Sequence, residues 1–210
     1  MSIKAIVVDI DGTLTDMNKL IFTSGIEALR KVQEKGIPVS LASGNVLPVA
    51  YGLSTYLGLR GPIVAENGGV VSHQERIYQV AEGILAERAY EHLRSRMPVE
   101  RLFTDRWRCT EVALRRTADL ERVRKELEGW DVTIEATGFA IHIMDRGHGK
   151  LAGVRKMAEI SGIDISQIIT GRATGRAIGE GRLEAEAQAA RPKTSAPKAA
   201  PKHAPTEPGA

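Results

Sequence analysis

Two aspartates near the start of the chain have the types and the spacing of a reactive site. Asp9 and Asp11 lie two residues apart at the end of an apolar run, and Gly12 follows them. Residues two apart in an extended backbone project to the same face, and a glycine lets the chain turn sharply beyond them. The pattern therefore predicts the chemistry of two converging carboxylates, and favours it over an ordinary Asp-Gly turn.

The pattern of apolar residues predicts the elements that position this pair. Residues 3–10 are rich in Ile and Val, which is typical of a strand buried on both faces of a parallel sheet. Apolar residues at helical spacing predict a crossover helix over 23–35, and further strands are expected at 37–42 and 62–65. This alternation indicates an open, Rossmann-like α/β sheet, in which ligands bind outside the carboxyl ends of the strands, where both aspartates should lie.

The middle of the chain has a different pattern. Residues 76–145 are expected to form an inserted α+β domain, with helices at 85–96 and 120–128 and strands at 110–114, 132–135 and 140–143. The main α/β core is expected to comprise residues 1–75 and 146–169, the second part being a helix and a strand that begins at Ile165. Residues 170–210, largely a low-complexity Pro, Ala and Lys sequence, should be a disordered tail that replaces the end of the core.

Composition limits the partners. The sequence pI is about 9.1, but residues 1–169 hold 22 basic and 22 acidic side chains, so the excess charge belongs to the tail. With aromatics at only 4%, a nucleic-acid partner is not expected. The single Cys109 cannot form an internal disulfide, and no apolar run or secretory signal indicates a membrane or export, so a cytoplasmic protein is expected. Composition leaves the oligomeric state open.

Three segments together resemble the haloacid dehalogenase superfamily. Asp9-Ile10-Asp11-Gly12-Thr13 resembles its first motif, Ser43 in Leu41-Ala42-Ser43-Gly44-Asn45 its second, and Lys150 at the head of a helix its third. The insert lies where one branch of the superfamily carries an α/β cap. The segments DIDGTLTD, LASGN and AENGG are most similar to archaeal phosphoglycolate phosphatases, which are similar to sucrose-phosphate phosphatases.

The resemblance implies a role for each matching residue. Asp9 would be the nucleophile that forms an aspartyl-phosphate, and Asp11 would be the general acid and base. Ser43 and Lys150 would bind the phosphoryl group of a small phosphorylated substrate. Asp9 and Asp11 would also hold the Mg²⁺ cofactor, Asp11 through its backbone carbonyl.

The sequence departs from the superfamily at the fourth motif, which has the form Gly-Asp with a further Asp. At the matching place the chain reads Thr170-Gly171-Arg172, and no Asp follows Asp164. Because the missing carboxylates normally bind Mg²⁺, weaker metal binding is expected. The abrupt change after Ile169 indicates a reading-frame change in the coding sequence or a tail acquired by a degenerate paralogue.

The resulting prediction is a magnesium-dependent phosphate monoester hydrolase, with 2-phosphoglycolate as the expected substrate and glycolate as the product. Three alternatives stay open. The chain could be a catalytically impaired relative that binds phosphorylated ligands without turnover, or a phosphatase for another small sugar phosphate. Residues 191–210 could also serve as a basic interaction arm.

Further polar residues are weaker candidates for the site. Asn45 and Asn67 follow strand ends at the same edge of the expected sheet and could line the pocket. Arg106, Arg108 and Glu111 of the insert could meet the carboxylate or sugar of a substrate. For these three, exposed strand or loop charges are the simpler interpretation.

Overall fold

Residues 2–16 and 18–171, which the computed structural model describes, form two sheets. The larger has six strands in the order β5-β4-β3-β2-β1-β9. Strands β3, β2, β1 and β9 run parallel, and β4 and β5 continue the sheet antiparallel. The bounds of these strands are β1 (Ala5–Asp9), β2 (Val39–Ala42), β3 (Ile63–Ala65), β4 (Val70–His73), β5 (Arg76–Gln79) and β9 (Ile168–Gly171).

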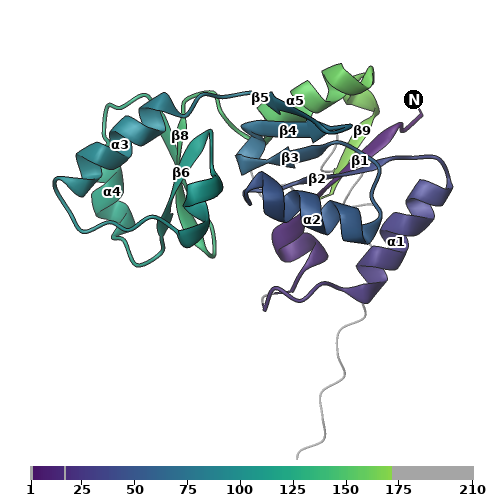
Figure 1. Cartoon of the computed structure of the whole chain (residues 1–210), viewed down its shortest axis with the longest axis horizontal. Coiled ribbons are helices and arrows are strands. Elements are labelled where there is room, and N and C mark those ends of the chain that lie inside the picture. Colours follow the sequence, from purple (N-terminus) through teal and green to yellow (C-terminus); the bar gives the residue numbers. More distant parts are fainter. Residues whose placement is uncertain (1, 17, 172–210) are drawn as a thin grey trace, which may run out of the picture.

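Helices cover both faces of the larger sheet (Figure 1). Leu41 and Val8 pack with α1 (Thr23–Glu34) and α2 (Leu47–Leu57) on one face. Val7 and Val64 pack with α5 (Lys150–Ser161) on the other. Because successive strand residues point to opposite faces and both faces are covered, β1 must be apolar at consecutive positions, as its sequence is.

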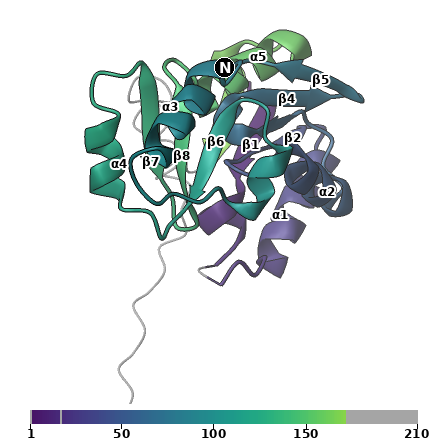
Figure 2. The same ribbon diagram turned by 60° about the vertical axis from the view of Figure 1, so that its left-hand side comes forward.

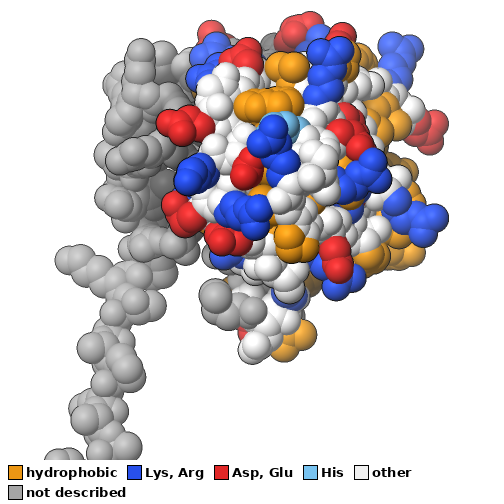
Figure 3. Space-filling model, turned by 90° about the vertical axis from the view of Figure 1, so that its left-hand side faces the viewer, with side chains coloured by type: hydrophobic (Ala, Val, Ile, Leu, Met, Phe, Trp, Pro, Cys, Tyr) orange, Lys and Arg blue, Asp and Glu red, His pale blue; other side chains and the backbone are white. Residues whose placement is uncertain are grey.

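The second sheet is antiparallel, with the order β6-β8-β7. It consists of β6 (Glu111–Arg115), β7 (Val132–Ala136) and β8 (Ala140–Asp145). Its core is formed with α3 (Ile84–Arg94) and α4 (Leu120–Glu126), which lie on the side away from the larger sheet (Figures 1 and 2). The second sheet and its two helices form a second lobe, and its outer face carries interspersed basic and acidic side chains (Figure 3). On helices α3 and α4 of this lobe, Arg94 pairs with Glu91 and Arg124 pairs with Glu121.

Four short helical turns complete the description. They are η1 (Ile10–Leu14), η2 (Glu66–Gly68), η3 (Phe103–Trp107) and η4 (Ile165–Gln167). Two of them, η1 and η2, directly follow β1 and β3 and hold the polar side chains at the carboxyl ends of these strands. In the part of the chain described, no helix is long and apolar enough to cross a membrane.

The predicted α/β class with a parallel core sheet is confirmed, but two boundaries differ. The strand expected to begin at Ile165 begins at Ile168, because Asp164 caps η4 by accepting a hydrogen bond from the Ser166 N–H. Strand β5 pairs with β4 in the larger sheet. We therefore propose that the inserted domain begins after residue 79 instead of at 76. The expected disordered tail lies, apart from residues 170 and 171, outside the described residues.

Helix α5 approaches the larger sheet closely through Gly153. A Cβ atom on Gly153 would lie 2.6 Å from the Gly68 Cα and would overlap the Val64 side chain. In contrast, a Cβ on Gly52, in the middle of α2, would meet no atom within 4 Å. An added methyl group would therefore collide with neighbouring atoms at Gly153 but not at Gly52.

We expect Gly153→Ala to lower the free energy of unfolding by about 1–3 kcal/mol, because backbone atoms of η2 must move aside. Gly52→Ala should raise it by up to about 1 kcal/mol, because alanine has the higher helix propensity. Urea unfolding followed by circular dichroism measures both values. Equal changes in the two variants would contradict the close packing of α5.

Candidate active site

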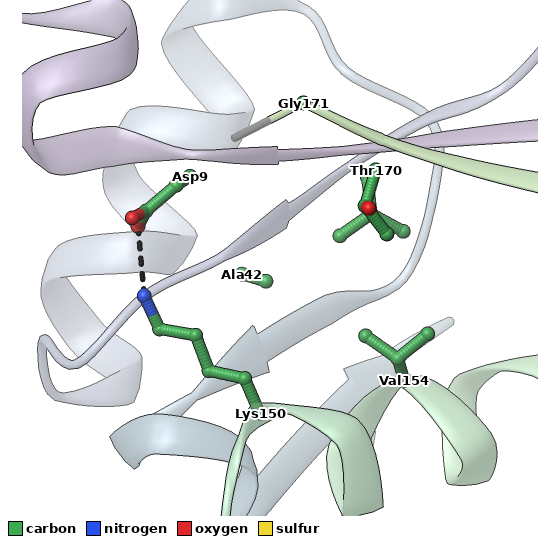
Figure 4. A pocket seen from close by; sticks show the side chains of 7 residues that line it. Asp9, Ala42, Lys150, Val154, Thr170 and Gly171 are labelled. Atoms are coloured by element: carbon green, nitrogen blue, oxygen red, sulfur yellow. Dashed lines mark ion pairs between the residues drawn. The ribbon is translucent and has the colours of Figure 1, made fainter. Parts of the chain in front are cut away.

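Asp9 and Lys150 form an ion pair at the carboxyl end of β1. The Lys150 Nζ lies 3.1 Å from the Asp9 Oδ1, and the same oxygen accepts a hydrogen bond from the Ile10 N–H at 2.9 Å (Figure 4). The Asp9 side chain is 10% exposed. Burial raises the pKa of Asp9, while the charge and hydrogen bond of Lys150 act in the opposite direction. The pair therefore holds a carboxylate where solvent stabilises it poorly.

Lys150 is the first residue of α5, following Gly149. A cation in the first turn is unfavourable for the helix, because the amino end of a helix carries partial positive charge. The position of Lys150 is consequently explained by its contact with Asp9 and not by the stability of α5.

Asp11 is turned toward the same edge of the sheet by the tight turn η1. Gly12 in this turn has a φ of +73°, a conformation that favours glycine. The Asp11 Oδ1 lies 2.6 Å from the Lys19 Nζ, and the Oδ2 accepts a hydrogen bond from the Asn45 Nδ2 at 3.0 Å. Both carboxylate oxygens thus have a partner, and the side chain is 28% exposed.

Ser43 follows β2 directly and is fully buried. Its Oγ accepts hydrogen bonds from the Asn45 N–H and from the Asn45 Nδ2, both at 3.0 Å. Since a hydroxyl has one proton to give, Ser43 can still donate to a ligand. Asn45 links Ser43 to Asp11, so the chain brings the four predicted site residues to one edge of the sheet.

A small pocket lies between β1, β9 and the start of α5. Thr170 and Gly171 of β9 line it together with Asp9 and Lys150, and the side chains of Val7, Ala42 and Val154 complete the wall (Figure 4). Asp9 is the single carboxylate among these seven lining residues. Thr170 and Gly171 stand at the end of β9, the position where the resemblance places the start of the fourth motif.

The two aspartates fit a magnesium ion only with help from other ligands. Mg²⁺ is usually held by one or two protein carboxylates together with waters and the phosphate of a substrate. Asp9 supplies one carboxylate, and the backbone carbonyl that the resemblance assigns at Asp11 would add one further oxygen. Residues 2–16 and 18–171 contain no cluster of three or more His, Cys, Asp or Glu side chains that could hold a metal ion.

Asn67 and Glu111 connect the two lobes next to this site. The Asn67 Nδ2 donates to the Glu111 Oε2 at 2.9 Å, and the Asn67 Oδ1 lies where it would be only 2.8 Å from a Cβ atom added to Gly44. Beside them, the Glu66 Oε2 accepts hydrogen bonds from the Thr110 N–H at 3.0 Å and the Thr110 Oγ1 at 2.8 Å. Residues of η2 therefore fasten the second sheet to the first.

Two of the charged candidates of the insert, Arg108 and Glu111, are buried and not exposed. Their side chains are 1% and 0% exposed, and they form an ion pair with each other. Arg106 instead stacks near the ring of Trp107, at 5.5 Å from its centroid. Sequence reasoning missed this buried network, because isolated charges in a strand carry no sign of their burial.

Glu111 stays ionised although it is buried. Desolvation raises its pKa, but the hydrogen bond and charge of His142, the charge of Arg108 and the hydrogen bond of Asn67 outweigh it. The net pKa of Glu111 lies below its ordinary value of 4.5. The carboxylate therefore holds together groups from both sheets.

Comparisons with known proteins identify the family of this chain. The profile of the haloacid dehalogenase-like hydrolase family matches residues 6–96. A phosphoglycolate phosphatase of Methanothermobacter thermautotrophicus is 36% identical over 166 residues, covering 79% of this chain and 75% of the relative. A phosphoglycolate phosphatase of Thermoplasma acidophilum is 35% identical over 169 residues, covering 80% and 75%.

Solved structures share the fold. A crystal structure from Thermoplasma acidophilum matches with a TM-score of 0.75 at 34% identity, covering 81% of this chain and 76% of that chain. A haloacid dehalogenase-like hydrolase from Bacteroides thetaiotaomicron has the same fold, with a TM-score of 0.65 at 20% identity and coverage of 89% and 85%. The chain belongs to the haloacid dehalogenase-like hydrolase family. Within that family it is a phosphoric monoester hydrolase.

We expect Glu111→Gln to lower the free energy of unfolding at pH 7 by about 3 kcal/mol, because it removes the closer of the two carboxylates that face the buried Arg108 and leaves only Asp105, at 3.9 Å. Since the pKa of Glu111 is lowered in the folded protein, the stability from its charge is present above pH 4.5 and lost as the pH falls through the lowered pKa. Urea unfolding at pH 7 and pH 4 tests this difference.

The matched control is Glu121→Gln, which removes an 81% exposed carboxylate from an ion pair with Arg124. That change should alter stability by less than about 0.5 kcal/mol at either pH. The role given to the buried carboxylate would be contradicted if Glu111→Gln lowered the free energy of unfolding no more than the control does. It would also be contradicted if the decrease were larger at pH 4 than at pH 7.

Proposed function

We propose that this chain hydrolyses 2-phosphoglycolate to glycolate and phosphate, with Asp9 as the nucleophile. The observation that carries the proposal is the buried Asp9 carboxylate, 3.1 Å from the Lys150 Nζ, with Asp11 two residues farther along the same edge. The choice of 2-phosphoglycolate as the substrate rests on the curated relatives, which are phosphoglycolate phosphatases at 35–36% identity.

Four side chains divide the work. An Asp9 oxygen attacks phosphorus and the bond to the ester oxygen breaks, while Asp11 gives a proton to the departing oxygen. Asp11 then takes a proton from a water molecule whose oxygen attacks the aspartyl-phosphate, and the bond from phosphorus to Asp9 breaks. Ser43 donates a hydrogen bond to a phosphoryl oxygen, and Lys150 neutralises charge on the others.

Asp9 and Asp11 would hold Mg²⁺ through their oxygens. When bound, the ion draws negative charge from the phosphoryl oxygens. Lys150, which pairs with the Asp9 carboxylate, competes with a cation for the same oxygen. We therefore propose a weakly held ion, which binds together with the substrate phosphate.

A second candidate is a protein that binds phosphate esters without turnover. It is favoured by the end of β9, where Thr170 and Gly171 line the pocket without adding a carboxylate. The two candidates predict the same binding of substrate but differ in the release of phosphate.

We expect the purified full chain to release phosphate from 2-phosphoglycolate in the presence of Mg²⁺. Addition of a chelator should stop this release. Asp9→Asn should reduce the rate at least about a thousandfold, because the amide cannot act as the nucleophile. A colorimetric assay of free phosphate measures the rate. Asp131→Asn, which alters a 70% exposed carboxylate of the second lobe, is the control and should keep full activity.

Each outcome selects a candidate. Turnover that survives both the chelator and Asp9→Asn would exclude the proposed mechanism. Tight binding of 2-phosphoglycolate with no phosphate release would select the binding protein instead.

A further inference from the structure

Lys19 stands at the mouth of the site on a loop with a defined shape. The Asp16 Oδ1 accepts hydrogen bonds from the Asn18 N–H at 2.8 Å and the Leu20 N–H at 2.9 Å. Lys19 itself has a φ of +67°, which is uncommon for a residue other than glycine. Hydrogen bonds on either side of Lys19 thus constrain the backbone from which its side chain extends.

The ammonium group of Lys19 lies between the two lobes. It is 2.6 Å from the Asp11 Oδ1 in the first lobe and 4.3 Å from the ring centroid of Phe139, in the turn between β7 and β8. The ring of Phe139 in turn packs against His142, with a centroid distance of 5.5 Å. Groups from both lobes therefore contact the Lys19 ammonium. The Lys19 side chain is nevertheless 56% exposed.

The contact with Asp11 conflicts with the role proposed for Asp11. An Asp11 oxygen must face the oxygen of the leaving group, but the Oδ1 is bound to Lys19 and the Oδ2 to Asn45. Turnover is therefore favoured if Lys19 moves to another negative charge when a substrate is present. In 2-phosphoglycolate, the carboxylate is separated from the ester oxygen by a single methylene group, so that charge is close to Asp11.

Three other cations of the two lobes already have carboxylate partners of their own. Lys150 pairs with Asp9 on the phosphate side of the site. Arg108 is 1% exposed and pairs with Glu111, and Arg101 pairs with Glu87 and Asp105. Lys19 is partly exposed, lies beside Asp11 and has a flexible side chain.

We propose that Lys19 exchanges partners during substrate binding, leaving Asp11 and pairing with a carboxylate on the leaving group. This proposal rests on the proposed function and assigns to Lys19 the selection of acidic phosphate esters. An ester without that carboxylate leaves the Lys19–Asp11 pair intact. Phe139 supplies an aromatic face that keeps the ammonium group between the two positions.

Equilibrium binding tests the proposal without turnover. The full chain carrying Asp9→Asn is titrated by calorimetry with 2-phosphoglycolate and with methyl phosphate, which has no carboxylate. Adding Lys19→Met should weaken 2-phosphoglycolate binding by about tenfold or more, the loss of one charge-assisted contact, and should leave methyl phosphate binding unchanged or tighter. Lys19→Arg should restore most of the affinity.

Lys31→Met is the matched control, since Lys31 is an exposed lysine of α1. It should change neither affinity. An equal loss for both esters in Lys19→Met, or the same loss in Lys31→Met, would overturn the proposal, because both results describe a general effect of charge.

Turnover gives a second, independent result. With Asp9 intact, Lys19→Met should slow the hydrolysis of 2-phosphoglycolate and speed that of methyl phosphate, so that the two rates move in opposite directions. Unchanged preference between the esters would overturn the role of Lys19 while leaving the proposed phosphatase standing. Failure of the parent chain to bind either ester would overturn both.

Discussion

The buried pair of Asp9 and Lys150 is the interaction on which the other features of the site depend. Burial raises the pKa of Asp9, and Lys150 opposes that change. Lys150 reaches Asp9 only because α5 lies directly on the larger sheet, an approach that Gly153 permits by having no side chain toward Gly68. The ion pair of the site thus depends on close backbone packing, because a wider distance between α5 and the sheet would separate the lysine from the carboxylate.

The second lobe completes the site from outside the larger sheet. Asn67 and Glu66 of η2 bind Glu111 and Thr110, so the loop that follows β3 is also the attachment point of β6. At the opposite side of the mouth, Phe139 packs near the Lys19 ammonium. In the proposed mechanism, the edge of the parallel sheet supplies the phosphate chemistry, and Phe139 of the antiparallel lobe lies near the cation beside Asp11.

The end of β9 is where the sequence departs from the fourth motif that the resemblance implies. Its Thr170 and Gly171 line the pocket beside Asp9 without a carboxylate. In a hydrolase that draws on Mg²⁺, fewer carboxylates mean fewer fixed oxygen ligands and a larger share from water and substrate. The two lysines of the site then matter more, because they carry the positive charge that the protein itself provides.

The sequence by itself determined the class of fold, since uninterrupted apolar strands alternating with helices are stable only in a sheet covered on both faces. It also placed Asp9, Asp11 and Ser43 at strand ends, because the carboxyl ends of parallel strands share one edge. Only the tertiary structure decided that Asn45 and Lys19 hold Asp11, that Arg108 and Glu111 are buried, and that β5 belongs to the larger sheet. Such contacts join residues far apart in the chain or depend on the course of a loop, and no local pattern of polar and apolar residues specifies them.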